Sequence, residues 1–344
     1  MSVGMSSGAG VRDARLFPLV WLKITSAFFL AVIGEFFGES QDWQNYVNLF
    51  DALRASGVSV EGTAERVEIG FKLLALSLLA LSLSNLSIYA VVSALSLFLK
   101  CVVINAFTTR RTTFVIAVGF YFVCVVPLHE LTQVRAALAI SMLFLAYVFI
   151  LRRSLFLAIM SAAISVLFHI SAVAILPLLL FVFLFERKVI TLTRFTIFIL
   201  ALAAYLTVAS VVSILLLNLE DILLVVEAYL EEGFGDEKVN PFSATVLLSI
   251  AISALALLRW PHLSPNMRYI LLFELCGLGV FYATIGFPVI ALRLYELSQA
   301  FWVLFVVEGL KAEDALLRLS TWMFALLSMG VYGYIYFLSG TFFL

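Results

Sequence analysis

Ionisable residues stand at the ends of long apolar runs at three places in this chain: His129, Glu130 and Arg135, then His169, then Arg293 and Glu296. An ionised group in apolar surroundings costs about 2.5–3.5 kcal/mol on insertion scales, so a chain that retains several of them is expected to use them. Arginine can bind phosphate oxygens through two parallel hydrogen bonds, and histidine can act as a base or contact a phosphate near neutral pH. The three groups therefore predict one site that handles a phosphorylated compound.

The rest of the composition excludes a soluble globule. Hydrophobic residues make up 64% of the 344 residues, charged residues only 12%, and the mean hydropathy is +1.13. The apolar runs recur from end to end, which indicates an all-α polytopic integral membrane protein with a single transmembrane domain over residues 1–344. The first run, from Leu16, lacks a cleavage pattern and is interpreted as a retained span.

Several chemistries have no support in the sequence. There is no glycine-rich phosphate loop, no CxxC pair and no HExxH motif, so nucleotide-driven transport and zinc chemistry are not expected. Cys101, Cys124 and Cys276 lie in apolar stretches and are interpreted as packing residues. We expect no cofactor, no metal and no nucleic-acid partner.

The apolar runs predict about 11–12 transmembrane helices. They cover residues 16–34, 86–107, 112–128, 131–151, 154–168, 171–185, 195–217, 244–258, 268–286, 289–307 and 319–338, with a further apolar segment at 67–84. Basic residues recur in the short loops after every second run, and such loops stay in the cytoplasm. The N-terminal basic residues also favour the cytoplasmic side, so the chain must cross the membrane an even number of times between Arg15 and Arg110. Three apolar segments lie in that stretch, and one of them therefore does not cross. We assign that role to 67–84, as a re-entrant or surface segment; the alternative is a true crossing with the N-terminus outside.

The same topology places two acidic loops, 35–66 and 218–243, on the outer side. Residues 219–232 within the second loop favour either an interfacial amphipathic helix or a solvated loop. The first loop mixes Asp42, Trp43 and Tyr46 with amides, which suits sugars because hydroxyls need acceptors and ring faces need aromatic platforms. The two aromatic residues are also typical interface anchors.

The outer ends of the later spans supply the remaining candidates. Arg135 is expected about one turn inside its helix, either holding a phosphate or pairing with Glu130 or another carboxylate. His169 separates two apolar runs and is interpreted as functional, although a lone histidine is more often a core residue; His129 competes for its role. Arg293 follows a glycine–proline break, so with Arg135 it could bracket a diphosphate.

Taken in order, these motifs resemble the EpsG-like branch of the Wzy-type bacterial polysaccharide polymerases over about residues 30–300. The matching residues are Asp42 and Tyr46; Glu68, Gly70 and Phe71; Gln133, Arg135 and Ala139; Phe168, His169 and Ser171; and Arg293 and Tyr295. One departure is that members often have Gly-x-Arg-Gln where this chain has Thr132-Gln133-Val134-Arg135.

The resemblance implies a glycosyltransferase with a GT-C-like architecture in the bacterial inner membrane, with its active site facing the periplasm. Such an enzyme joins oligosaccharide repeat units carried on undecaprenyl diphosphate and releases the lipid diphosphate without a metal. It implies donor and acceptor lipids as partners, together with the bilayer and a chain-length regulator protein.

The resemblance also implies roles for the candidate residues. Arg135 and Arg293 would hold the diphosphate, with His169 as base or phosphate contact. The acceptor hydroxyl would be activated or oriented by carboxylates, for which the candidates are Asp42, Glu68, Glu130 and Glu296. Tyr46, Gln133, His129 and Tyr295 are further candidates for substrate binding.

Three other functions remain open. An O-antigen ligase uses the same donor but usually carries its key histidine in a large outer loop, and 218–243 contains none. A flippase or transporter of lipid-linked sugars would also use intramembrane arginines, but it is expected to show internal repeats. A structural membrane subunit is the third alternative.

Overall fold

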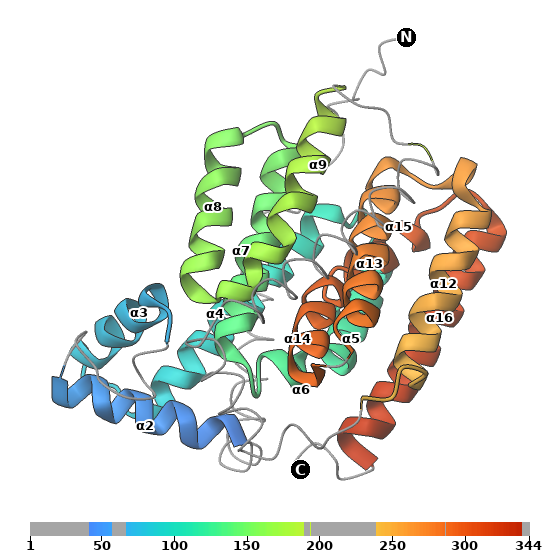
Figure 1. The fold of residues 1–344 in the computed structure, drawn as a ribbon. Helices are drawn as coiled ribbons and strands as arrows, with labels where there is room; N and C mark the ends of the chain where they lie inside the picture. The colour runs from blue at the N-terminus through green and yellow to red at the C-terminus, as the bar shows by residue number, and fades with distance from the viewer. Residues whose placement is uncertain (1–40, 57–66, 189–192, 194–238, 286, 339–344) are drawn as a thin grey trace.

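The structure, a computed structural model, describes residues 41–56, 67–188, 193, 239–285 and 287–338 (Figure 1). The predicted spans 16–34 and 195–217, the amphipathic segment 219–232 and most of the two long outer loops lie outside these residues. Every regular element in the described ranges is a helix.

The described elements follow the predicted apolar runs closely. They are α2 (Gln41–Ser56), α3 (Ile69–Ala80), α4 (Asn85–Phe107), α5 (Arg111–Cys124), α6 (Val126–His129), α7 (Val134–Leu151), α8 (Leu155–Phe168), the 3₁₀ helix η2 (Ile170–Ile175), α9 (Leu176–Glu186), α12 (Ala244–Leu258), the 3₁₀ helix η3 (Trp260–His262), α13 (Pro265–Ala283), α14 (Pro288–Gln299), α15 (Trp302–Leu310), α16 (Ala315–Gly333) and the π-helical turn η4 (Tyr334–Leu338). Three predicted runs are interrupted: 112–128 at Val125, 171–185 by η2, and 289–307 between α14 and α15.

Four stretches in the described part are long and apolar enough to cross a bilayer: Asn85–Phe107, Val134–Leu151, Ile290–Leu310 and Ala315–Tyr336. Five more apolar helices have 10–17 residues, among them α3, α5, α8 and α12. The protein is therefore an all-helical polytopic membrane protein, as the composition predicts.

Side-chain caps fix where several helices begin. Ser84, Ser243, Ser264 and Asp314 each accept a hydrogen bond from the backbone N–H three residues later. Such a cap satisfies one of the N–H groups that the first turn leaves without a helical partner.

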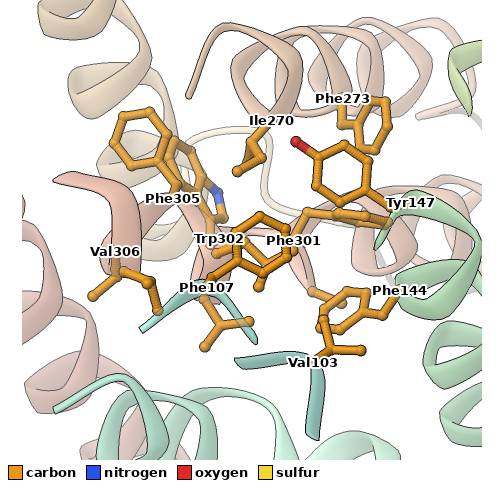
Figure 2. Packing of buried hydrophobic residues seen from close by; sticks show 14 of the residues in the cluster. Val103, Phe107, Phe144, Tyr147, Ile270, Phe273, Phe301, Trp302, Phe305 and Val306 are labelled. Atoms are coloured by element: carbon orange, nitrogen blue, oxygen red, sulfur yellow. The ribbon is translucent and has the colours of Figure 1, made fainter. Parts of the chain in front are cut away.

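Helix α7 lies in the middle of the bundle, between α4, α8 and α9. Its Phe144 and Tyr147 meet Phe301 and Phe273 in an aromatic cluster (Figure 2). The ring centroids of Phe144 and Phe301 are 4.8 Å apart, and those of Phe273 and Phe301 are 4.6 Å apart in an edge-to-face arrangement. Aromatic pairs in this geometry contribute beyond their buried area, so the cluster ties the N-terminal and C-terminal helices together.

Helix α3 covers most of the segment 67–84 and has 12 residues. At about 1.5 Å per residue it rises about 18 Å, well short of the hydrocarbon core of about 30 Å. It packs on α2 and the end of α8 and shares with them a small core that includes Phe50 and Phe71.

Several basic loops lie together at one end of the bundle. At one end Lys311 donates a hydrogen bond to the Phe107 carbonyl oxygen at 2.8 Å, and Arg259 pairs with Asp314, so the basic loops after α4, α12 and α15 lie together. Helices α2, α6 and α14 lie at the opposite end, the lower end of Figure 1. That end holds the candidate site.

Candidate active site

Glu68 joins three segments that are far apart in the sequence. Its Oε2 accepts a hydrogen bond from an Arg135 Nη at 2.8 Å, and its Oε1 lies 3.1 Å from His169 Nδ1. The backbone N–H of Ile170 also donates to Oε1, at 3.0 Å. One carboxylate therefore holds the start of α7 and the junction between α8 and η2 against the start of α3.

The local sequence around Glu68 explains how it reaches this place. Glu68 is the extended residue before α3, so its side chain stays outside the helix. A Cβ added to Gly70 would lie 2.6 Å from the Leu167 carbonyl oxygen, so only glycine lets α3 approach α8 this closely. Phe71 is fully buried beside Phe50 and Tyr46. The three residues of the Glu-x-Gly-Phe motif thus dock one helix end.

Arg135 lies nearer to the helix start than predicted. Because α7 begins at Val134, Arg135 belongs to its first turn rather than to the second. Its backbone N–H points to the Tyr46 hydroxyl at 3.4 Å, and its guanidinium lies 5.9 Å from the Tyr46 ring centroid. The side chain is 30% exposed, so the guanidinium has room for a second anion beside Glu68.

The electrostatics of this cluster fix the charge of Glu68. Burial alone would raise its pKa, but the hydrogen bond to His169, the positive charge of Arg135 and the Ile170 N–H outweigh burial and lower the pKa to about 2. Glu68 is therefore a carboxylate throughout the physiological range and a weak proton acceptor. Burial raises the pKa of Tyr46, which keeps this phenol neutral.

A second group of candidates lies beside the first. The Gln133 side chain lies near the Glu296 carboxylate, and the charge of Arg293 acts on both Glu296 and His129. His129 is also within electrostatic range of His169. Asp42 acts on Tyr46 and on Glu296.

Since α14 also packs against η2, one end of the bundle brings together most of the candidate residues predicted from the sequence. They are Asp42, Tyr46, Glu68, His129, Gln133, Arg135, His169, Arg293 and Glu296.

Glu130 and Tyr295 are placed differently. Glu130 is fully buried and pairs with Lys100, while Tyr121 and Ser96 donate to the same carboxylate. It is not the carboxylate that holds Arg135; that partner is Glu68. Tyr295 is 2% exposed and packs against Phe281, with ring centroids 5.1 Å apart.

Three residues near the site were not predicted from the sequence. Lys100, in the middle of α4, is the buried partner of Glu130, and its charge inside an apolar run was the available signal. Tyr89 donates to the Leu131 carbonyl oxygen at 2.9 Å and so fixes the loop before α7. Glu274 is a 1% exposed carboxylate within α13. Across the described residues, no three His, Cys, Asp or Glu side chains are arranged to hold a metal ion.

Comparison with known families decides the identity. The family model described as "EpsG family" matches residues 19–343. The chain belongs to the EpsG family. No curated protein and no solved structure matches it.

Membership in the EpsG family confirms the resemblance drawn from the ordered motifs. It makes this chain a membrane protein of polysaccharide biosynthesis, similar to polysaccharide polymerases and of the glycosyltransferase kind. Its multi-pass helical structure places it in a lipid bilayer.

Proposed function

We propose that this EpsG-family protein polymerises oligosaccharide repeat units carried on undecaprenyl diphosphate and releases undecaprenyl diphosphate, as a Wzy-type polymerase does. The observation that carries the proposal is the contact of Arg135 and His169 with one carboxylate, Glu68, at the end of the bundle opposite the basic loops. This arrangement holds a guanidinium and an imidazole rigidly while leaving donors for a ligand.

The donor's diphosphate is bound by Arg135, Arg293 and His169. Arg135 uses one nitrogen for Glu68, so its other N–H groups remain for phosphate oxygens. Arg293 forms no ion pair within the described ranges, and its side chain is partly exposed. Fixed cations at this position stabilise the charge that develops on the leaving diphosphate.

The acceptor hydroxyl is activated by Asp42 or Glu296. Glu68 is a weak base because of its low pKa, and Glu130 is buried against Lys100. In the reaction the acceptor oxygen bonds to the donor's anomeric carbon, the bond from that carbon to the diphosphate breaks, and the hydroxyl proton passes to the carboxylate. No step requires a metal.

The orientation follows from the loop charges. If the basic loops face the cytoplasm, the site opens on the periplasmic side of the bacterial inner membrane.

The test uses purified full-length protein, undecaprenyl-diphosphate repeat units and gel analysis of the products. Polymerisation gives a ladder; an O-antigen ligase gives one transfer to a lipid A-core acceptor, and a transporter forms no new bond. The ladder should vanish with Arg135→Ala while the variant stays folded. A wild-type protein that binds several authentic repeat units but makes no product would overturn the proposal.

A further inference from the structure

A small open cavity lies between the ends of α4 and α7, at the end of the bundle opposite the candidate active site. Its volume is about 120 Å³, and its lining residues are Ala106, Phe107, Val148, Leu151 and Arg152. One water needs only about 10–15 Å³ of such space, so a group the size of a phosphate fits. The Phe107 ring stacks on the Tyr147 ring, with centroids 5.9 Å apart, and this contact holds the two helix ends together.

Helix α7 ends beside this cavity in an unusual way. The Ser154 N–H donates to the Phe149 carbonyl oxygen at 2.9 Å, and the Arg153 N–H donates to the Ile150 carbonyl oxygen at the same distance. This pattern is a Schellman motif, whose left-handed residue is usually glycine because a Cβ is strained there. Here that residue is Arg153, with a φ of 60°. The chain therefore keeps an arginine side chain where the backbone favours none.

Four arginines lie in the two loops next to the cavity. Arg152 and Arg153 are exposed at the end of α7, and Arg110 and Arg111 are exposed three and four residues after Phe107. No carboxylate in the described ranges lies within ion-pair distance of Arg110, Arg152 or Arg153. These three side chains therefore remain available for an anion.

Two carboxylates at the same end already have cationic partners. Glu308 pairs with Lys311 at 2.6 Å, and Asp314 pairs with Arg259. Lys311 also donates to the Phe107 carbonyl oxygen, next to the cavity. Neither carboxylate therefore offsets the positive charge of the arginines around the cavity.

An exposed apolar stripe on α4 leads to the cavity. Val91, Leu95, Val102 and Ala106 are exposed and lie four, seven and four residues apart, so they share one face of the helix. At about 1.5 Å per residue, the stripe is about 22 Å long. One leaflet of the hydrocarbon core is about 15 Å thick, so an acyl chain that starts at the cavity can follow this stripe into the membrane.

We propose that this cavity binds the headgroup of an anionic phospholipid, with its phosphate on Arg110, Arg152 and Arg153 and one acyl chain along the α4 stripe. Arginine binds phosphate oxygens through parallel hydrogen bonds. A zwitterionic headgroup brings an ammonium group among these arginines and is disfavoured. The preference of cytoplasmic loops for basic residues accounts for charge in these loops, but not for an arginine at a left-handed position beside a cavity.

The experiment compares two lipids that differ only in headgroup charge. Native mass spectrometry of the full-length protein measures retention of phosphatidylglycerol and phosphatidylcholine with the same acyl chains. Wild type should retain phosphatidylglycerol about tenfold more strongly, and Arg152→Ala should reduce this preference about fivefold, the value of one arginine at a membrane surface. Arg318→Ala is the control, because Arg318 is exposed on α16 and outside the cavity, and it should leave the preference unchanged.

A second variant separates lipid binding from folding. Arg153→Gly removes the charge and also the backbone strain, so it should unfold at the same or a higher temperature in phosphatidylcholine. It should nevertheless lose about fivefold of the preference for phosphatidylglycerol. Equal retention of both lipids by wild type, an unchanged preference in Arg153→Gly, or an equal loss in Arg318→Ala would overturn the inference. None of these readouts depends on polymer formation, so the inference stands or falls separately from the proposed function.

Discussion

Two carboxylate–cation pairs near the start of α7 have the same chemistry and different surroundings. Lys100 and Glu130 are both 0% exposed and lie between α4, α5 and the loop before α7. Arg135 and Glu68 are 30% and 14% exposed and lie where three chain segments end. The surroundings therefore distinguish the Lys100–Glu130 pair, which stabilises the fold, from the Arg135–Glu68 pair, which can exchange partners with a ligand.

The difference follows from desolvation. Separating the two charges of a fully buried ion pair costs much free energy, because each charge would remain in apolar surroundings. A partly exposed arginine can bind a phosphate while keeping its carboxylate, because water and the ligand compensate its charge. The Lys100–Glu130 pair fixes the loop that leads to Arg135. This buried pair therefore positions the Arg135–Glu68 pair.

The largest effect is expected from breaking the buried pair. Lys100→Met leaves Glu130 buried without its cation and should destabilise the protein by about 3–5 kcal/mol. Thermal unfolding in detergent measures the loss. The double variant Lys100→Met/Glu130→Gln should recover much of it, because no uncompensated charge remains. A single variant as stable as wild type would show that this pair does not hold the fold.

Breaking the exposed pair should affect catalysis instead. Arg135→Ala should reduce polymer formation by about 10²–10³-fold, whereas its loss of stability should be limited because Glu68 keeps its contacts with His169 and the Ile170 N–H. Arg135→Lys should also fail, since an ammonium does not reproduce two parallel hydrogen bonds. The control is Arg54→Ala, which removes an exposed pair with Asp51 and should cost at most about 1 kcal/mol. Full chain-length distribution in Arg135→Ala would refute the diphosphate contact.

A substitution that changes no charge tests the packing of α3 on α8, which positions the Arg135–Glu68 pair. Gly70→Ala places a methyl group 2.6 Å from the Leu167 carbonyl oxygen and should push α3 from α8, at a cost of about 1–3 kcal/mol. Polymer yield should fall with stability, because Glu68 moves away from His169. Gly119→Ala is the matched control: a Cβ there meets nothing within 4 Å, so stability should be unchanged or slightly higher.

The last effect is the contribution of Glu68 to stability, which depends on pH. The folded pKa of Glu68 is about 2 against an ordinary value of 4.5, so its contribution is present above pH 4.5 and is lost as pH falls toward 2. In Glu68→Gln this part of the acid sensitivity should disappear, and the variant should be less stable at pH 7. Unfolding temperatures from pH 7 to pH 3 measure both. Parallel curves for the two proteins would contradict the assignment.

Much of the fold was readable from the apolar runs. The helix bounds of α4, α8 and α12 agree with the predicted segments within a residue or two, because a membrane helix must be long, apolar and bounded by polar loops. The break at Val125 and the division between α14 and α15 were missed, although Pro127 follows the first closely and Ser298 and Gln299 directly precede the second.

The site was predicted in part. The motifs around Glu68, Arg135 and His169 stood out because ionisable groups are costly in such surroundings. The role of Glu130 stayed open because both Glu68 and Glu130 precede Arg135 and either could have paired with it. Lys100 was overlooked although the same cost argument applied to it.

The sequence by itself determined that this chain is a helical membrane protein of the EpsG family, with its unusual charges at the ends of particular runs. Only the tertiary structure decided which charges meet. Glu68 joins Arg135 and His169 across 67 and 101 residues, and Lys100 joins Glu130 across 30. The physical reason is that an ion pair depends on separation in space and on desolvation, and both are fixed by how the helices pack rather than by order along the chain.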